Sequence, residues 1–70
     1  MRIMFDNNTR SIEFDGTEFW LAGHSIHYRL GNSTGVLGRY ETPERAFQIF
    51  WDMHCEWEKS PLSTFCMPEV

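Results

Sequence analysis

The chain has few basic residues and no long apolar segment. Ten Asp and Glu stand against six Lys and Arg, so the formal net charge at pH 7 is −4. Nucleic-acid-binding proteins usually carry a basic patch, because neutralising phosphates supplies most of their affinity. Here the basic residues are scattered, so we predict no nucleic-acid binding. No apolar run approaches the roughly 20 residues of a membrane-spanning helix, and the opening residues lack the pattern of a secretion signal. We therefore predict a soluble, cytoplasmic protein with no membrane partner.

Cysteine is equally scarce. Only Cys55 and Cys66 are present, without a Cys-x-x-Cys motif, so we expect free thiols in a reducing compartment; the sequence leaves open whether the two pair. His24, His27 and His54 complete a set of side chains with the right chemistry for zinc. Their spacing matches no standard zinc finger, and His24 and His27 would point to opposite sheet faces if both lay in one strand. We predict no metal and no cofactor.

No catalytic motif is present. His54 and Cys55 are neighbours in a predicted helix, where adjacent residues diverge by about 100° and cannot act as base and nucleophile. The segment 31–35 is glycine-rich but lacks the lysine of a phosphate-binding loop, so we predict a hairpin loop there. A one-helix chain of this size has little room for a shaped cleft. We therefore predict that the protein is not an enzyme.

Aromatic residues, by contrast, are abundant at 16% of the chain. A domain of 70 residues buries only about 60% of the surface that its unfolded chain exposes. The apolar content therefore exceeds what so small a core needs. Small chains often enlarge their core by associating with a second copy, so the composition favours a homo-oligomer, with a dimer as the simplest case.

Residues 2–40 are predicted to form a meander of about five short antiparallel strands. Alternation is clearest at Ser25–Leu30, where every second residue is apolar. Asp15-Gly16 is typical of a tight hairpin turn. The connections are too short for the crossovers that parallel strands require. The expected strands span residues 2–5, 11–14, 18–22, 25–30 and 36–40.

A helix is predicted from Pro43 to about Glu58. Thr42 is a good N-cap, because its hydroxyl can accept a hydrogen bond from a first-turn amide, and Pro43 suits the first helical position. The tail, residues 60–70, contains an apolar segment that is expected to fold back as an edge strand. The sequence thus predicts one α+β domain over residues 1–70, with an antiparallel meander and a C-terminal helix packed on one sheet face.

The apolar stripe of this helix is wider than one small sheet requires. Its centre and borders comprise Ala46, Phe47, Ile49, Phe50, Trp51, Met53, His54 and Trp57. Phe47 and Trp51 lie one turn apart at its edge, and a soluble monomer rarely leaves such a pair bare. We predict self-association through Phe47, Trp51 and the neighbouring Phe50. The alternative is that tail residues 65–67 cover the same pair within one chain.

One face of the predicted sheet carries candidate partner-binding residues. Trp20, His27 and Arg29, together with Arg39, are expected to share it. One interpretation is an ordinary solvated face with a single large aromatic. The other is a recognition surface, because Trp and Arg are frequent interface anchors. A small anionic ligand or nucleotide held by Arg29 and His27 is a further alternative.

Three segments carry a resemblance to known proteins. Residues 37–46 (LGRYETPERA) resemble the LGxYxTxERA segment of a group of small, mostly uncharacterised proteins from Gram-positive bacteria and their phages. The opening MRI and the FCMPE of residues 65–69 resemble the start and end of that group. The resemblance implies no enzyme activity and a phage or prophage context, in which small acidic proteins often bind and block a host protein. The resulting hypothesis is a protein-interaction module that inhibits a host anti-phage defence protein.

Overall fold

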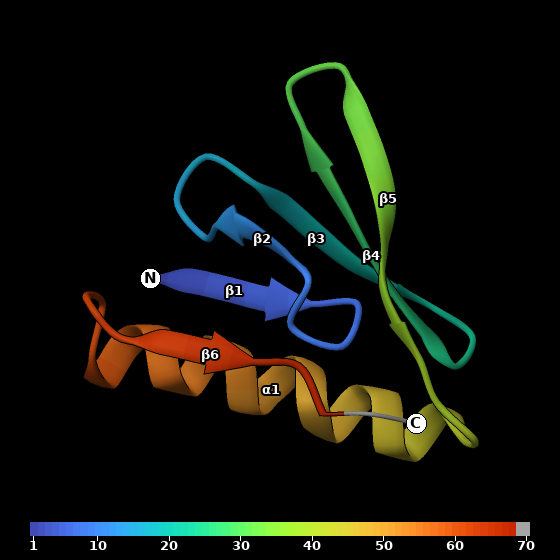
Figure 1. Ribbon diagram of the computed structural model, residues 1–70. Helices are drawn as coiled ribbons and strands as arrows, with labels where there is room; N and C mark the ends of the chain where they lie inside the picture. Colours follow the sequence, from blue (N-terminus) through green and yellow to red (C-terminus); the bar gives the residue numbers. More distant parts are fainter. Residues whose placement is uncertain (69–70) are drawn as a thin grey trace.

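The computed structural model describes residues 1–68, which contain six strands and one helix (Figure 1). The prediction of a small α+β domain is confirmed. Glu69 and Val70, the last residues of the predicted tail, lie outside the described residues. The elements in chain order are β1 (Arg2–Phe5), β2 (Arg10–Glu13), β3 (Glu18–Ala22), β4 (Ser25–Leu30), β5 (Ser33–Arg39), α1 (Pro43–Lys59) and β6 (Thr64–Cys66).

The strands form two three-stranded sheets rather than one. The sheet β3-β4-β5 is antiparallel throughout, whereas in the sheet β2-β1-β6 the central strand pairs antiparallel with β2 and parallel with β6. Helix α1 contacts β3 and β4. The five predicted strands are therefore present in consecutive order, but the meander is divided where β2 leads into β3 (Figure 1).

The turn at Asp15-Gly16 connects the two sheets and does not close a hairpin. The Phe14 amide donates to the Met1 carbonyl at 2.8 Å, which extends the pairing of the first sheet. The Thr17 amide donates to the Phe14 carbonyl at 3.2 Å across the turn, where Gly16 has a φ of +80° that favours glycine. The Phe14 amide is thus bonded to the first sheet and the Thr17 amide is bonded within the turn. The hairpin predicted for Asp15-Gly16 is therefore wrong.

Two tight hairpins build the sheet β3-β4-β5. Each has a two-residue turn that opens with a glycine, Gly23 at φ +60° and Gly31 at φ +61°, as turns with glycine in the first position require. Leu30 pairs with Ser33 directly after the second turn, so β5 begins at Ser33. The loop predicted over residues 31–35 is accordingly too long, and the last strand starts three residues earlier than predicted.

Two glycines of β5 make room for tyrosine rings. A Cβ atom added at Gly35 would lie 2.7 Å from Cε1 of Tyr28, and one added at Gly38 would lie 2.6 Å from the Tyr40 hydroxyl. Real Cβ atoms do not approach other atoms so closely. The bare backbone of β5 therefore lets both tyrosines lie against it, and both are buried.

The tail returns as an edge strand, as predicted, and lies beside β1. The Arg2 amide donates to the Ser63 carbonyl at 3.2 Å, and the Met67 amide donates to the Met4 carbonyl at 2.8 Å. These bonds bracket the parallel pairing of β1 with β6. Met67 is buried in the core as a result.

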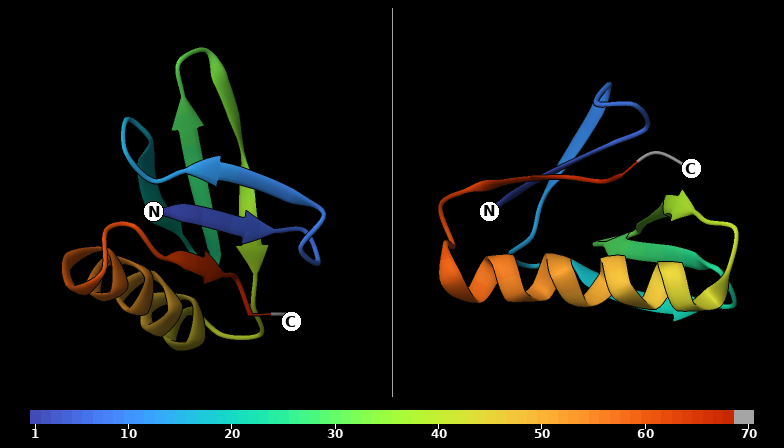
Figure 2. Two further views of the ribbon diagram at one scale, coloured as in Figure 1. Left: turned by 60° about the vertical axis from the view of Figure 1, so that its left-hand side comes forward. Right: turned by 90° about the horizontal axis from the view of Figure 1, so that it is seen from below.

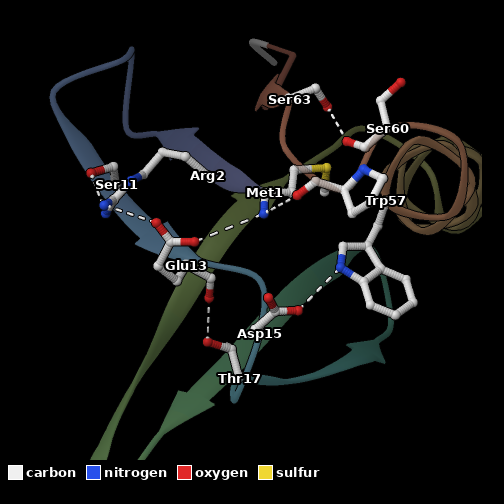
Figure 3. A network of polar contacts seen from close by, with 10 residues as sticks. Met1, Arg2, Ser11, Glu13, Asp15, Thr17, Trp57, Ser60 and Ser63 are labelled. Carbon is white, nitrogen blue, oxygen red and sulfur yellow. Dashed lines mark hydrogen bonds and ion pairs between the residues drawn. The ribbon is translucent and has the colours of Figure 1, made fainter.

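The start of the chain, the β2–β3 turn and the end of the helix meet in a polar network (Figure 3). The Met1 amino nitrogen donates to the Pro61 carbonyl at 2.6 Å and lies 3.8 Å from Oε2 of Glu13. Nearby, the Trp57 indole donates to the Asp15 carboxylate at 3.1 Å. The network therefore joins segments from both ends of the chain.

The helix begins where its cap predicts. The Thr42 hydroxyl accepts a hydrogen bond from the Arg45 amide at 3.1 Å, with Pro43 as the first helical residue. At the other end, the Ser60 amide donates to the Glu56 carbonyl at 2.8 Å. The helix has 17 residues, one more than predicted. Within residues 1–68, no helix is long and apolar enough to cross a membrane.

The core lies between the two sheets and the helix (Figure 2). Every layer contributes to it: β1 from one sheet, β4 from the other, and the buried stripe of α1. Its largest fully buried side chains are Ile3, Phe5, Ile26, Ile49 and Met53.

Candidate functional site

Helix α1 carries two large aromatic side chains that are about half exposed to solvent. Phe47 is 52% exposed and Trp51 is 51% exposed. Their rings form an edge-to-face pair, with centroids 6.2 Å apart and planes at 70°. We call this pair the helix ridge. β6 pairs with β1 instead of covering the ridge, so the alternative in which residues 65–67 fold over Phe47 and Trp51 does not occur.

Phe50 is less exposed than the two residues of the helix ridge. It is half-buried and packs against the core, and its ring centroid is 4.4 Å from that of His54. Nδ1 of His54 donates to the Phe50 carbonyl at 2.8 Å, because a carbonyl can only accept. Of the three residues predicted for self-association, Phe47 and Trp51 therefore present exposed rings, while Phe50 packs against the core.

A groove of about 490 Å³ opens beside the ridge. It lies between the β3–β4 turn and the first turns of α1, and Phe47 belongs to both the groove and the ridge. No sequence pattern predicts this groove, because its walls come from two segments, residues 21–23 and 43–48, that are distant in the sequence. Its lining residues are Leu21, Gly23, Pro43, Glu44, Phe47 and Gln48.

A second aromatic surface lies on the sheet β3-β4-β5. Trp20 and His27 are cross-strand partners whose rings stack, with centroids 5.5 Å apart and planes at 13°. Trp20 is 38% exposed. Arg29, two residues after His27 in β4, shares this face by the period of the strand. We call the surface the outer sheet face, since the alternate residues of the sheet point into the core.

A bulge in β5 brings Arg39 to the same face. Ile26 pairs with Gly38 and His27 pairs with Val36, so Leu37 is an extra residue in β5. In a regular strand, Arg39 would face away from Val36, because the two are an odd number of positions apart. The bulge reverses this and sets Arg39 opposite Ser25. All four predicted partner-binding residues thus share one face.

The charges of the outer sheet face are partly paired. Arg29 donates to Oε1 of Glu18, its cross-strand partner. The side chains of both residues are 57% exposed, so the pair adds little to stability but neutralises the Arg29 guanidinium. Within residues 1–68, Arg39 forms no ion pair and is exposed. Arg39 therefore supplies the unpaired positive charge of this face.

Tyr40 carries a titratable hydroxyl whose environment perturbs its pKa. Burial raises the pKa of the Tyr40 hydroxyl, and the positive charge of Arg45 offsets part of this rise. That hydroxyl donates to the Pro68 carbonyl at 2.9 Å, which is a structural contact. Cys55 and Cys66 are exposed free thiols. Over residues 1–68, no three His, Cys, Asp or Glu side chains lie close enough together to hold a metal ion.

Comparisons of this chain with protein-family models, with curated proteins and with solved structures found no match. The two exposed surfaces and the groove are therefore the features of this chain that bear on its function.

Proposed function

We propose that this protein is a non-enzymatic protein-interaction module that forms a homodimer through the helix ridge. The observation that carries the proposal is the pair Phe47 and Trp51, of which each side chain is about half exposed. Aromatic side chains of this size are the commonest anchors of protein interfaces. A two-fold contact would bury both pairs against each other, since the same patch serves both copies.

The energy of such a contact can be bounded. A half-exposed Phe or Trp offers roughly 100 Å² for burial, which at about 25 cal/mol per Å² is worth roughly 2.5 kcal/mol. Four such rings in a dimer supply roughly 10 kcal/mol. Association costs about 4–15 kcal/mol before any contact is counted. The gain from the ridge lies within the range of this cost, so a weak dimer is the most that the ridge alone would support, and a tight one needs further contacts.

We infer that the outer sheet face binds the target of the module. Trp20 and Arg39 are exposed there, away from the helix ridge, so a dimer would leave both copies free to bind. The segments that resemble small proteins of Gram-positive bacteria and their phages favour a host protein as the target. We propose that the module acts in the host cytoplasm as a phage-encoded inhibitor of an anti-phage defence protein.

Sedimentation velocity tests the dimer. The wild type at micromolar concentration is expected to sediment as a dimer, and Trp51→Glu as a monomer, because a buried unpaired charge is costly. Trp20→Glu is the matched control, since it places the same charge on the outer sheet face and should leave the dimer intact. A wild-type monomer of 8.3 kDa would refute the dimer.

Affinity capture from a bacterial host lysate tests the target-binding face. A host protein retained by the wild type should be lost with the double variant Trp20→Ala, Arg39→Glu and kept by Glu58→Ala, an exposed change on the helix. Retention of the same host protein by all three would show that the outer sheet face is not the binding site.

A small anionic ligand is the second candidate, because Arg39 is unpaired within the described residues and the Trp20–His27 stack offers a flat aromatic surface. The pairing of Arg29 with Glu18 weakens this candidate. A thermal-shift screen against nucleotides tests it, since a ligand that binds only the folded state raises the melting temperature. If no nucleotide raises the melting temperature, the nucleotide-binding candidate is refuted.

A further inference from the structure

The groove beside the helix ridge has the chemistry of a site for an indole ring. Leu21, Pro43 and Phe47 give it apolar walls. Glu44 and Gln48 add side-chain oxygen atoms that can accept a hydrogen bond. An indole is a flat apolar ring with one N–H donor, and a buried indole usually donates that hydrogen to a protein acceptor. The groove volume of about 490 Å³ lies in the range of pockets that hold whole small molecules, so one such ring fits.

The groove and the helix ridge form one continuous surface. Phe47 is a wall of the groove, and its other neighbour on the helix surface is the ring of Trp51. Trp51 itself does not line the groove of its own chain, because it lies one turn further along α1. In Figure 1, α1 runs along the lower border of the molecule, and no other element of residues 1–68 is drawn beyond it. A second helix can therefore lie along α1.

A two-fold contact through the helix ridge brings Trp51 to the groove of the other copy. Phe47 and Trp51 are four positions apart. If two antiparallel α1 helices meet opposite about residue 49, the Phe47 and Trp51 pairs of the two copies meet, and each Trp51 lies against Phe47 of the other chain. Parallel helices would instead set Trp51 against its own copy and leave the groove empty.

We propose that the groove holds the indole of Trp51 from a second copy, with the two α1 helices antiparallel and the indole N–H donating to the Glu44 carboxylate. The inference rests on the proposed homodimer and adds its direction and its contacts. The area that a dimer must bury supports this occupant. The helix ridge alone supports a weak dimer at most, because association itself is costly, and filling both grooves supplies further contacts from the same two-fold arrangement.

Disulfide formation tests the direction. Cys66→Ser leaves Cys55, an exposed residue of α1, as the one thiol of the chain. In the antiparallel dimer the two Cys55 residues are separated by roughly 18 Å along the helices, which is beyond the reach of a disulfide. Cys66→Ser should therefore stay unlinked on mild oxidation. Parallel helices would place Cys55 beside its own copy and link it.

Glu44→Cys added to Cys66→Ser should give a disulfide-linked dimer. In the antiparallel arrangement, position 44 of one copy lies within about one helical position of Cys55 in the other. The same two positions are roughly 16 Å apart within one chain, so they cannot link internally. Adding Cys55→Ser as well is the control, and this variant should stay unlinked because the two copies of position 44 are roughly 15 Å apart.

Sedimentation tests whether Trp51 enters the groove. Trp51→Phe keeps a ring on the ridge but loses the indole N–H, and Glu44→Ala loses the acceptor. Each should raise the Kd of the dimer roughly tenfold. Because both changes remove the same hydrogen bond, the double variant should be about as weak as Trp51→Phe alone. Glu58→Ala is the matched control, since Glu58 is also exposed and also seven positions from Trp51. Its effect on Kd should be the same with and without Trp51→Phe.

These measurements separate the inference from the dimer on which it rests. Three results would overturn the inference and leave the homodimer standing: a link through Cys55 in Cys66→Ser, no link after Glu44→Cys is added, or additive losses from Trp51→Phe and Glu44→Ala. A wild type that sediments as a monomer would overturn both.

Discussion

The indole Nε1 of Trp57 donates a hydrogen bond to Oδ1 of Asp15 at 3.1 Å, joining positions 42 residues apart. The Trp57 ring also stacks on Phe14, with centroids 5.1 Å apart and planes at 20°. Phe14 and Asp15 belong to the connection that divides the two sheets. The last turns of α1 are therefore held against the point where the chain passes from one sheet to the other.

Removing the carboxylate should loosen this connection. Asp15→Ala is expected to cost about 1 kcal/mol, the usual net worth of a hydrogen bond, and to lower the melting temperature by roughly 4–8 °C. Thermal denaturation followed by circular dichroism measures the change. Trp57→Phe keeps part of the ring packing but loses the same bond, so in its background Asp15→Ala should have almost no further effect. Additive losses in the double variant would show that the two residues do not interact.

The helix cap gives a second prediction. Thr42→Ala removes the acceptor of the Arg45 amide and should cost about 1 kcal/mol, again roughly 4–8 °C in melting temperature. Pro43→Ala is the control and should change little, because the first helical position needs no amide partner. If Thr42→Ala has the same melting temperature as the wild type, the cap does not stabilise the helix.

The helix was predictable because its signals are local. The cap at Thr42 and the spacing of Ala46, Ile49 and Met53 lie within a few turns of one another, and the structure places each as predicted. The division of the sheets was not predictable in this way. It depends on Phe14 bonding to Met1 and on Trp57 reaching Asp15, and neither contact has a signature in the local sequence.

The same distinction applies to the candidate surfaces. Period-two alternation predicted that His27 and Arg29 share a face. The pairing of Trp20 with His27 across the strands places Trp20 on that face as well. The position of Arg39 depends on the bulge at Leu37; the neighbouring Gly38 is compatible with a bulge, but a glycine alone does not fix which face Arg39 takes. The groove could not be predicted from the sequence, because Leu21 and Phe47 line it together only in the folded chain.

Folding should not depend on metal. No cluster of three potential ligands is present among residues 1–68, and a structural metal would contribute folding energy that a chelator removes. Prolonged incubation with EDTA is therefore expected to leave the far-ultraviolet circular dichroism and the melting temperature unchanged. A loss of signal that zinc restores would contradict this expectation.

Stability should fall at alkaline pH through Tyr40. Burial holds the pKa of its hydroxyl above the ordinary value of 10.0, so the folded state keeps this proton more tightly than the unfolded state. The stabilisation is complete below about pH 10 and is lost as the pH rises through the folded-state pKa.

At neutral pH, Tyr40→Phe should cost about 1 kcal/mol, because the Pro68 carbonyl loses its donor. Melting temperatures of both proteins between pH 7 and about pH 11 measure the effect. The advantage of the wild type over Tyr40→Phe should narrow above pH 10, because only the wild type must then bury a hydroxyl that the unfolded chain ionises. A gap that stays constant over this range would show that the Tyr40 hydroxyl does not couple protonation to folding.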